Sequence, residues 1–301
     1  MVTPRRQRRG SWSPTVSHPP SGGPPSIPQR TIRQPAALAG IGIHSGRTAT
    51  ILCRPAPTQA GIVFVRADVP GSPEIRASVE EVSDTRRGVT LGKDHPIRTV
   101  EHLLAAAAML EISNLRVEVH GEEMPILDGS VAPYVEALAA AGVVEQDATR
   151  SVHAVAHPVW LATENAWMLA VPSQVFRATY VVPLDHPTLG TQIVDFDPRR
   201  QRFATQFAPA RTWGFTHELD ALRQAGLARG ATVDNALGIG PEGFLSRPRF
   251  PDEPARHKLV DLIGDLALLG APLQAHVIAC RGSHTLHVDF VRRLVGSATP
   301  H

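Results

Sequence analysis

Apolar and polar residues alternate along the chain with two different periods, one typical of strands and one typical of helices. In the first half, strand-like runs occur at residues 48–56, 61–67 and 114–121, and helical runs occur at 99–110 and 132–142. A second set follows, with strand-like runs at 153–162, 167–173 and 176–184 and helical runs at 217–226 and 255–270. The pattern predicts an α+β fold with two domains, residues 31–148 and 149–297.

Two stretches, residues 101–121 and 256–280, repeat the same order of features. Each has a His near the start of an apolar helix, then a short turn and a strand-like run. We therefore expect two similar layers of sheet and helix, with helices that bring His102 and His257 together in a cleft between the domains.

The helical run 255–270 carries an apolar stripe and a separate polar stripe. His257, Asp261 and Asp265 follow one another at intervals of four. Residues four apart share one face of a helix, so a His and a carboxylate at this spacing can bind one ion. The spacing alone is weak evidence for a metal, because a chain with 14 histidines contains it by chance.

A neighbouring Glu-His pair strengthens the metal interpretation. Glu101 directly precedes His102 at the start of an apolar helical run. Zinc hydrolases commonly have three nitrogen or oxygen ligands and an open position for water, and a nearby carboxylate accepts the proton of that water. His102, His257 and Asp261 would form such a ligand set, with Glu101 as the base. Alternatively, Glu101 is a first-turn acid that the helix dipole stabilises, with Thr99 as the cap.

Another histidine, His284, lies at the edge of a strand-like run within residues 280–290. As an imidazolium it could stabilise an oxyanion or protonate a leaving amine, and Asp265 is the natural carboxylate to raise its pKa. Spacing alone favours the simpler alternative of a structural histidine, and the same holds for His287.

The composition narrows the class of protein. A chain of 301 residues with 43% hydrophobic residues can bury a large core, and its apolar runs are too short to span a membrane. Its two cysteines, Cys53 and Cys280, are too few for a disulfide framework and suit a reducing compartment. We therefore expect a cytoplasmic protein.

The charge is unevenly distributed along the chain. Residues 1–30 supply five arginines and no acid to a formal net charge of +2, so residues 31–301 carry −3. That body has no aromatic-interleaved basic stripe of the kind that binds nucleic acid. Residues 1–30 are rich in Pro, Ser and Gly, which predicts a disordered tail that catalysis does not need. An organellar transit peptide is the less favoured interpretation, because prolines oppose an amphipathic helix.

Five segments, in this order, closely resemble the family of UDP-3-O-acyl-N-acetylglucosamine deacetylases, zinc enzymes of lipid A synthesis. They are GIGIHSGRTATILCRPAP, TVEHLLAAAAMLEISNLRVEVHGEEMPILDGSVAPYVEAL, ARTWGF, RHKLVDLIGDLALLG and GSHTLH, and the resemblance extends from about residue 31 to residue 295. The resemblance implies that His102, His257 and Asp261 bind zinc, with iron(II) as the alternative ion in the cell. It also implies that Glu101 is the general base.

The same resemblance implies roles for residues that spacing alone leaves open. Thr212 would polarise the scissile carbonyl, and His284 with its charged partner Asp265 would be the second catalytic unit. Lys258 would contact the substrate. Only Lys258 and Lys93 are lysines in this arginine-rich chain, which favours a position that needs a compact charge facing phosphate.

In the family fold, two domains hold the active site between them, and a small insertion forms an apolar passage for the acyl chain. Residues 213–240 of the second domain match this insertion, and Trp213, Leu219 and Leu222 are among the residues that would line the passage. The alternative is that these side chains pack the insertion's own small core.

The chain departs from the family pattern around His284. The family usually has Ser-Gly-His followed by an apolar residue and Asn, whereas this chain has Gly282 before Ser283 and has His287 at the end of the motif. A glycine moved by one position can change the backbone path beside His284. Because no ligand changes, we expect an effect on efficiency rather than on chemistry.

The sequence therefore predicts a zinc-dependent amidohydrolase that removes the N-acetyl group of UDP-3-O-acyl-N-acetylglucosamine and releases acetate. Its partner is this UDP-linked acylated amino sugar. Contact with a membrane surface would be transient, and neither a nucleic acid nor an obligate protein partner is expected. Two alternatives remain: a degenerate paralogue that binds a nucleotide sugar or lipid without catalysis, and a non-enzymatic protein recruited through its arginine-rich tail.

Overall fold

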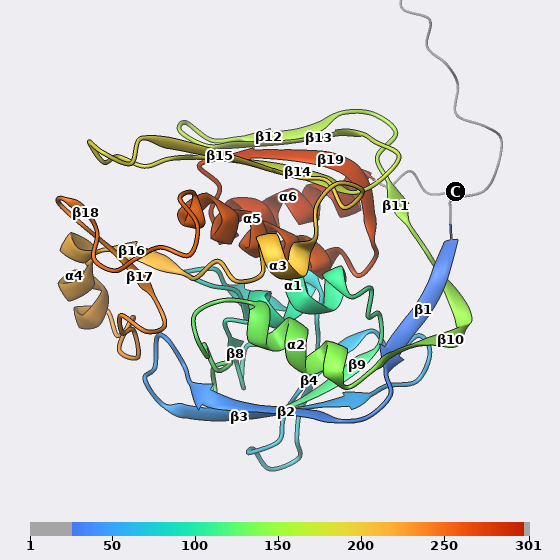
Figure 1. The fold of residues 1–301 in the computed structure, drawn as a ribbon. Coiled ribbons are helices and arrows are strands. Elements are labelled where there is room, and N and C mark those ends of the chain that lie inside the picture. Colours follow the sequence, from blue (N-terminus) through green and yellow to red (C-terminus); the bar gives the residue numbers. More distant parts are fainter. Residues whose placement is uncertain (1–25, 298–301) are drawn as a thin grey trace, which may run out of the picture.

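The computed structural model describes residues 26–297, in which two sheets form outer layers and helices fill the space between them (Figure 1). The first sheet has the order β2-β3-β9-β4-β5. Its strands are β2 (Ala36–Ile41), β3 (Thr48–Pro55), β9 (Leu115–His120), β4 (Ile62–Arg66) and β5 (Glu74–Arg76). The second sheet has the order β12-β13-β19-β14-β15, and the short β11 also pairs with β19. Its strands are β11 (His153–Ala154), β12 (Val159–Ala162), β13 (Trp167–Pro172), β19 (Leu273–Cys280), β14 (Arg177–Pro183) and β15 (Thr191–Phe196).

The two sheets have the same topology. In each order, the third and fourth strands are parallel and the other neighbours are antiparallel. One helix precedes the central strand and another follows it, which gives α1-β9-α2 in the first half and α5-β19-α6 in the second. These helices are α1 (Glu101–Met109), α2 (Ala132–Ala140), α5 (Glu253–Leu266) and α6 (His284–Ser297). The predicted α+β class, with two similar layers of sheet and helix, is confirmed.

Sequence periodicity explains how these layers pack. Along β19 every second residue, from Leu273 to Ala279, is buried, as expected for a strand with one face on the core. Apolar side chains of both halves form one continuous core. The two central helices approach closely because Gly264 of α5 lies against the Glu101 backbone of α1, where a Cβ atom would collide with the carbonyl group. This contact places the first turn of α1 beside α5.

A two-stranded ribbon, β1 (Ser26–Ile32) and β10 (Val143–Ser151), closes one side of the molecule (Figure 1). The predicted end of the tail at residue 30 is wrong, because Ser26–Arg30 belong to β1. The Gln29 side chain is buried there and accepts a hydrogen bond from the Asn114 amide. Residues 1–25 lie outside the described part of the chain. The predicted domain boundary near residue 149 falls within β10 and stays a prediction.

Each half carries additional elements between the edge strand of its sheet, β5 or β15, and its first core helix. In the first half they are η1 (Val79–Glu81), β6 (Val82–Asp84), β7 (Thr90–Leu91) and β8 (Ile97–Arg98). In the second half they are α3 (Phe203–Gln206), β16 (Trp213–Phe215), η2 (Thr216–Glu218), α4 (Leu219–Gln224), β17 (Leu237–Gly240) and β18 (Gly243–Phe244). Strands β16, β17 and β18 form a separate small sheet within and just beyond the predicted insertion at 213–240.

The segment that begins at His284 is helical, so the predicted strand-like run there is wrong. Most of its buried residues lie three or four positions apart, as on one face of a helix. They are His284, Leu286, His287, Val288, Phe290, Val291 and Leu294. The Ser283 hydroxyl accepts a hydrogen bond from the Leu286 backbone N–H and so stabilises the first turn of α6. The predicted helix at 255–270 is confirmed as α5, followed by η3 (Ala267–Leu269). Within residues 26–297, no helix is both long and apolar enough to cross a membrane.

Candidate active site

The predicted metal ligands meet where the first turn of α1 faces α5. His257 Nε2 lies 3.3 Å from Asp261 Oδ1, and His102 Nε2 lies 3.8 Å from the same oxygen. The three side chains are buried, and their potential ligand atoms lie within 4.8 Å of one another. We call these residues the ligand cluster. It combines residues from both halves of the chain, as the paired helices predict.

The ligand cluster fits a zinc ion in its chemistry and its spacing. The His257 Nδ1–H donates to the Ala210 carbonyl at 3.0 Å, which leaves the lone pair on Nε2. Burial lowers the pKa of His102 to about 3 and also lowers the pKa of His257, so both rings are in the neutral form that binds metals. Ligand atoms about 2.1 Å from a tetrahedral ion lie roughly 3.4 Å from each other, close to the separations within the cluster.

Asp261 is held in its charged form. Burial opposes its ionisation, but the Lys258 ammonium beside it helps to hold the pKa of Asp261 well below its usual range. Lys258 Nζ donates to Asp261 Oδ2 at 3.0 Å, and Asp261 Oδ1 is the oxygen that faces the two histidines. One carboxylate oxygen is therefore available to a cation while the other is neutralised by Lys258.

Glu101 is buried at the start of α1, beside the ligand cluster. Its Oε2 accepts a hydrogen bond from the Val89 backbone N–H at 3.0 Å, which fixes the carboxyl group. Burial raises the pKa of Glu101 to about 7, although the charge of His284 opposes this rise. A carboxyl group that titrates near neutral pH is suited to accepting and releasing a proton.

The expectation that Thr99 caps α1 is wrong. The residue before the helix is Val100, and no side chain caps the helix there. Thr99 has a φ of +61°, and its hydroxyl instead donates to Glu123 Oε1 at 3.4 Å. Backbone sterics disfavour this conformation for a β-branched residue, so the loop before Glu101 is held in place by its tertiary contacts.

His284 and Asp265 are in contact, as predicted. His284 Nδ1 donates to Asp265 Oδ2 at 2.8 Å, and His284 Nε2 lies 3.8 Å from Asp261 Oδ2. Burial alone would lower the pKa of His284, but the Asp265 carboxylate raises it to about 9. The free nitrogen of the ring therefore carries a proton near neutral pH and faces the ligand cluster.

His287 is a member of this second group that sequence reasoning missed. Its Nδ1 donates to the same oxygen, Asp265 Oδ2, at 2.7 Å, and its Nε2 lies 2.9 Å from the Tyr180 hydroxyl. Asp265, His284 and His287 are all buried, and we call them the proton cluster. The signal in the sequence was the His at the end of the motif, where the family usually has Asn; the structure shows that this His is buried and therefore needs hydrogen-bond partners.

The displaced glycine and His287 belong to one local arrangement. A Cβ atom at Gly282 would lie 2.6 Å from His287 Nε2 and would also meet the Tyr180 hydroxyl. The Tyr180–His287 hydrogen bond therefore requires a glycine at residue 282. The two departures from the family pattern are coupled, and His284 remains directed toward the site.

Two further predicted site residues, Thr212 and Trp213, lie where the chain enters the small sheet at β16. Thr212 is anchored through its backbone to Gly129 and Leu237, at 2.8 Å each. The Trp213 indole donates to the Pro254 carbonyl at 3.2 Å, and its ring packs against the core.

Leu219 and Leu222 lie on α4, which has no buried residue. Their side chains are half-exposed, which leaves apolar surface on the insertion. The roles of Thr212, Trp213, Leu219 and Leu222 stay predictions.

Glu123 is a second buried residue that sequence reasoning missed. Its two carboxylate oxygens accept hydrogen bonds from the backbone N–H groups of His44 and Ser45, at 2.8 and 2.7 Å. It therefore shapes the GIHSG loop of the first sheet. Its position directly after Glu122 gave no periodic signal, because only the tertiary structure distinguishes the buried acid from the exposed one.

Fold and site together define a class: α+β proteins with a repeated sheet-and-helix unit and a buried His, Asp and Glu site between the repeats. Residues 29–296 match the family model of UDP-3-O-acyl N-acetylglycosamine deacetylase, and the chain belongs to this family.

Three curated relatives support the assignment, and each is named UDP-3-O-acyl-N-acetylglucosamine deacetylase. The Trichormus variabilis protein is 39% identical over 89% of this chain and 98% of its own length. The Thermosynechococcus vestitus protein is 41% identical over 88% of this chain and 93% of its own length. The Myxococcus xanthus protein is 40% identical over 90% of this chain and 88% of its own length. The chain is therefore a member of a family of deacetylase enzymes.

Proposed function

We propose that the protein hydrolyses the N-acetyl group of UDP-3-O-acyl-N-acetylglucosamine in lipid A biosynthesis, with acetate as a product. Family membership and the names of the relatives support the substrate. The observation that carries the proposal is the buried ligand cluster beside Glu101. Its histidines are neutral, its aspartate is charged, and the pKa of Glu101 is raised to about 7. The free cysteines Cys53 and Cys280 favour the cytoplasm as the place of action.

His102, His257 and Asp261 would hold one zinc ion, with iron(II) as the alternative. When bound, the ion supplies Lewis acidity, which polarises a carbonyl group and makes a water molecule a better nucleophile near neutral pH. The histidine orientation supports this assignment, because His257 Nδ1 is already occupied by the Ala210 carbonyl.

Proton transfer is assigned to Glu101 and His284. Glu101 accepts a proton from the attacking water as the new carbon–oxygen bond forms. The His284 imidazolium stabilises the developing oxyanion and then gives its Nε2 proton to the sugar nitrogen as the carbon–nitrogen bond breaks. Asp265 keeps His284 charged through the 2.8 Å hydrogen bond, and the Thr212 hydroxyl donates to the carbonyl oxygen of the amide.

Substrate recognition is assigned to Lys258 and the insertion. The Lys258 ammonium keeps two N–H groups after it donates to Asp261, and these can face an anionic group of the substrate. The acyl chain would lie on the apolar side chains of Trp213, Leu219 and Leu222. Each buried methylene would contribute about 0.8 kcal/mol to binding.

Metal analysis of the purified protein, together with an acetate-release assay on the acylated UDP-sugar, tests the proposal. We expect about one zinc per chain and turnover that requires the 3-O-acyl chain. A chain that binds the sugar nucleotide but releases no acetate with zinc bound would instead be a degenerate paralogue.

A further inference from the structure

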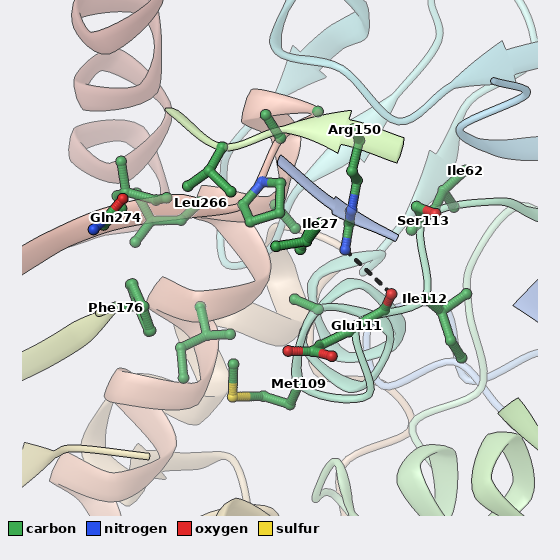
Figure 2. A pocket seen from close by; sticks show the side chains of 18 of the residues that line it. Ile27, Ile62, Met109, Glu111, Ile112, Ser113, Arg150, Phe176, Leu266 and Gln274 are labelled. Atoms are coloured by element: carbon green, nitrogen blue, oxygen red, sulfur yellow. Dashed lines mark hydrogen bonds between the residues drawn. The ribbon is translucent and has the colours of Figure 1, made fainter. Parts of the chain in front are cut away.

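A cavity of about 680 Å³, drawn in Figure 2, lies at the opposite end of the α1–α5 helix pair from the candidate active site. Glu101 and His102 begin α1, whereas Ala108 and Met109 at its end line the cavity. With a rise of about 1.5 Å per residue, the seven residues from His102 to Met109 span roughly 10 Å. The cavity is therefore separate from the ligand cluster.

The walls of this cavity are mostly apolar. Figure 2 shows side chains that converge on it from distant parts of the chain, namely Ile27, Ile62, Met109, Ile112, Phe176 and Leu266. None of the residues of the predicted acyl passage at 213–240 lines it. A volume of this size is within the usual range of small-molecule sites. The cavity therefore suits an apolar ligand other than the acyl chain of a substrate bound at the active site.

Two of the residues that line the cavity, Arg76 and Arg150, are positively charged. Arg150 Nη2 donates to the backbone carbonyl of Glu111 at 3.1 Å (Figure 2), and Arg150 Nε is buried with no hydrogen-bond partner among residues 26–297. The Glu111 carboxylate forms its ion pair with Arg30. Across the described residues, neither Arg150 nor Arg76, which also lines the cavity, forms an ion pair with a carboxylate.

We propose that this cavity binds one fatty acid, with its alkyl chain between the ends of α1 and α5 and its carboxylate on Arg150. A guanidinium group presents N–H donors in a planar fork that matches a carboxylate. The apolar walls are complementary to an alkyl chain. The half-buried Arg150, which has no carboxylate partner, is complementary to one anionic head group. Binding would give Arg150 the carboxylate partner that the described protein residues do not supply.

Equilibrium titration of the full chain with dodecanoate, below its micelle concentration, tests this proposal. Dodecan-1-ol is the uncharged control ligand. Arg150→Gln removes the cation, and Ala271→Trp fills the cavity from the loop between η3 and β19. Arg33→Gln is the matched control, because Arg33 is exposed and does not line the cavity. Deacetylation of the acylated UDP-sugar by each variant reports that it is folded.

We expect one dodecanoate per chain and weaker binding of the alcohol. Arg150→Gln should weaken dodecanoate binding by about tenfold or more without affecting the alcohol, because it removes a charge-assisted hydrogen bond. Ala271→Trp should abolish binding of both ligands, and Arg33→Gln should change nothing.

Three results would overturn the proposal. They are unchanged dodecanoate affinity in Arg150→Gln, loss of binding in Leu222→Asp rather than in the cavity variants, and binding that occurs only after residues 1–25 are removed. The second result would assign the fatty acid to the acyl passage, and the third would assign the cavity to the N-terminal segment. If Ala271→Trp is inactive and unfolded, the comparison of Arg150→Gln with Arg33→Gln decides.

Discussion

The ligand cluster and the proton cluster contain the same residue types, two histidines and one aspartate, but their geometry differs. In the ligand cluster, the two Nε2 atoms lie 3.3 and 3.8 Å from Asp261 Oδ1. In the proton cluster, both Nδ1 atoms donate to Asp265 Oδ2, at 2.8 and 2.7 Å. A hydrogen already occupies each short contact of the proton cluster, whereas the ligand cluster has room for an ion between its lone pairs.

Electrostatics follow the same division. In the ligand cluster, Asp261 is neutralised by Lys258, which is not a member of the cluster, and burial keeps His102 and His257 uncharged. In the proton cluster, Asp265 is neutralised by another member of the cluster, His284, because the carboxylate raises the pKa of His284 to about 9. Two His and one Asp therefore specify neither a metal site nor a proton donor until the direction of each N–H is known.

The largest expected effect comes from breaking the ligand cluster. His257→Ala should lower kcat/KM by more than about 100-fold, because loss of a ligand exceeds the usual 10- to 100-fold cost of losing an outer-shell partner. A steady-state deacetylation assay checks this effect. Near-normal turnover of a correctly folded His257→Ala protein would remove His257 from the site.

Glu101→Gln should lower kcat by roughly 100-fold or more while the metal stays bound, since the amide keeps the shape of the side chain but cannot accept the proton. Kinetics and metal analysis of the same sample separate the two effects. Loss of the metal in Glu101→Gln would mean that Glu101 is a ligand, and the roles within the ligand cluster would have to be reassigned.

The pH dependence of kcat/KM should be bell-shaped. Glu101 must be ionised to accept a proton, so activity should rise as pH increases through about 7. His284 must be protonated, so activity should fall as pH increases through about 9. Asp265→Asn removes the negative charge that raises the His284 pKa, so the basic limb should move to lower pH. A basic limb that persists unchanged in His284→Ala would belong to a different group.

A smaller effect is expected for His287→Asn. The shorter amide cannot bond both Asp265 and Tyr180, so the buried Tyr180 hydroxyl loses its partner at a cost of about 1–3 kcal/mol in the free energy of unfolding. Metal content should not change. The double variant with Tyr180→Phe should recover most of this stability, because replacing both partners removes the unsatisfied hydroxyl. Denaturant unfolding of the four proteins checks the cycle, and a loss of metal in His287→Asn would contradict the separation of the two clusters.

The smallest effect is expected at the N-terminus. Deletion of residues 1–25 should leave kcat/KM and Tm unchanged, because their composition, rich in Pro, Ser and Gly, disfavours packing on the rest of the chain. Deletion through Arg30 should lower Tm, since it removes β1 residues and the buried Gln29. Equal stability of the two truncated proteins would show that this part of β1 contributes nothing to the fold.

Much of the fold was predictable from periodicity, because long amphipathic segments such as 255–270 report their buried face directly. The meeting of His102 and His257 was predictable because both histidines lie in the N-terminal parts of helices in repeated units. The helix at His284 was missed because a short apolar run next to a strand fits both periods. The Tyr180–His287 contact joins residues 107 positions apart, and no local pattern reports such a pair.

The limits of the tail were misjudged for a related reason. Ser26–Arg30 contain few apolar residues, and they are ordered by pairing with β10, more than 100 residues later in the chain. The amino-acid composition of a short segment does not report that it pairs with a strand so far away in the chain. Thr99 likewise followed the rule for a helix cap, but its hydroxyl is bound by Glu123, a residue that follows α1 in the chain.

The most direct test of the central claim is the zinc content per chain of three proteins purified in parallel: the wild type, His257→Ala and His287→Ala. The two variants make the same chemical change in clusters of the same composition. The account predicts about one zinc in the wild type, far less than one in His257→Ala, and about one in His287→Ala. Full zinc content in His257→Ala, or its loss in His287→Ala, would contradict the assignment of the metal to the ligand cluster.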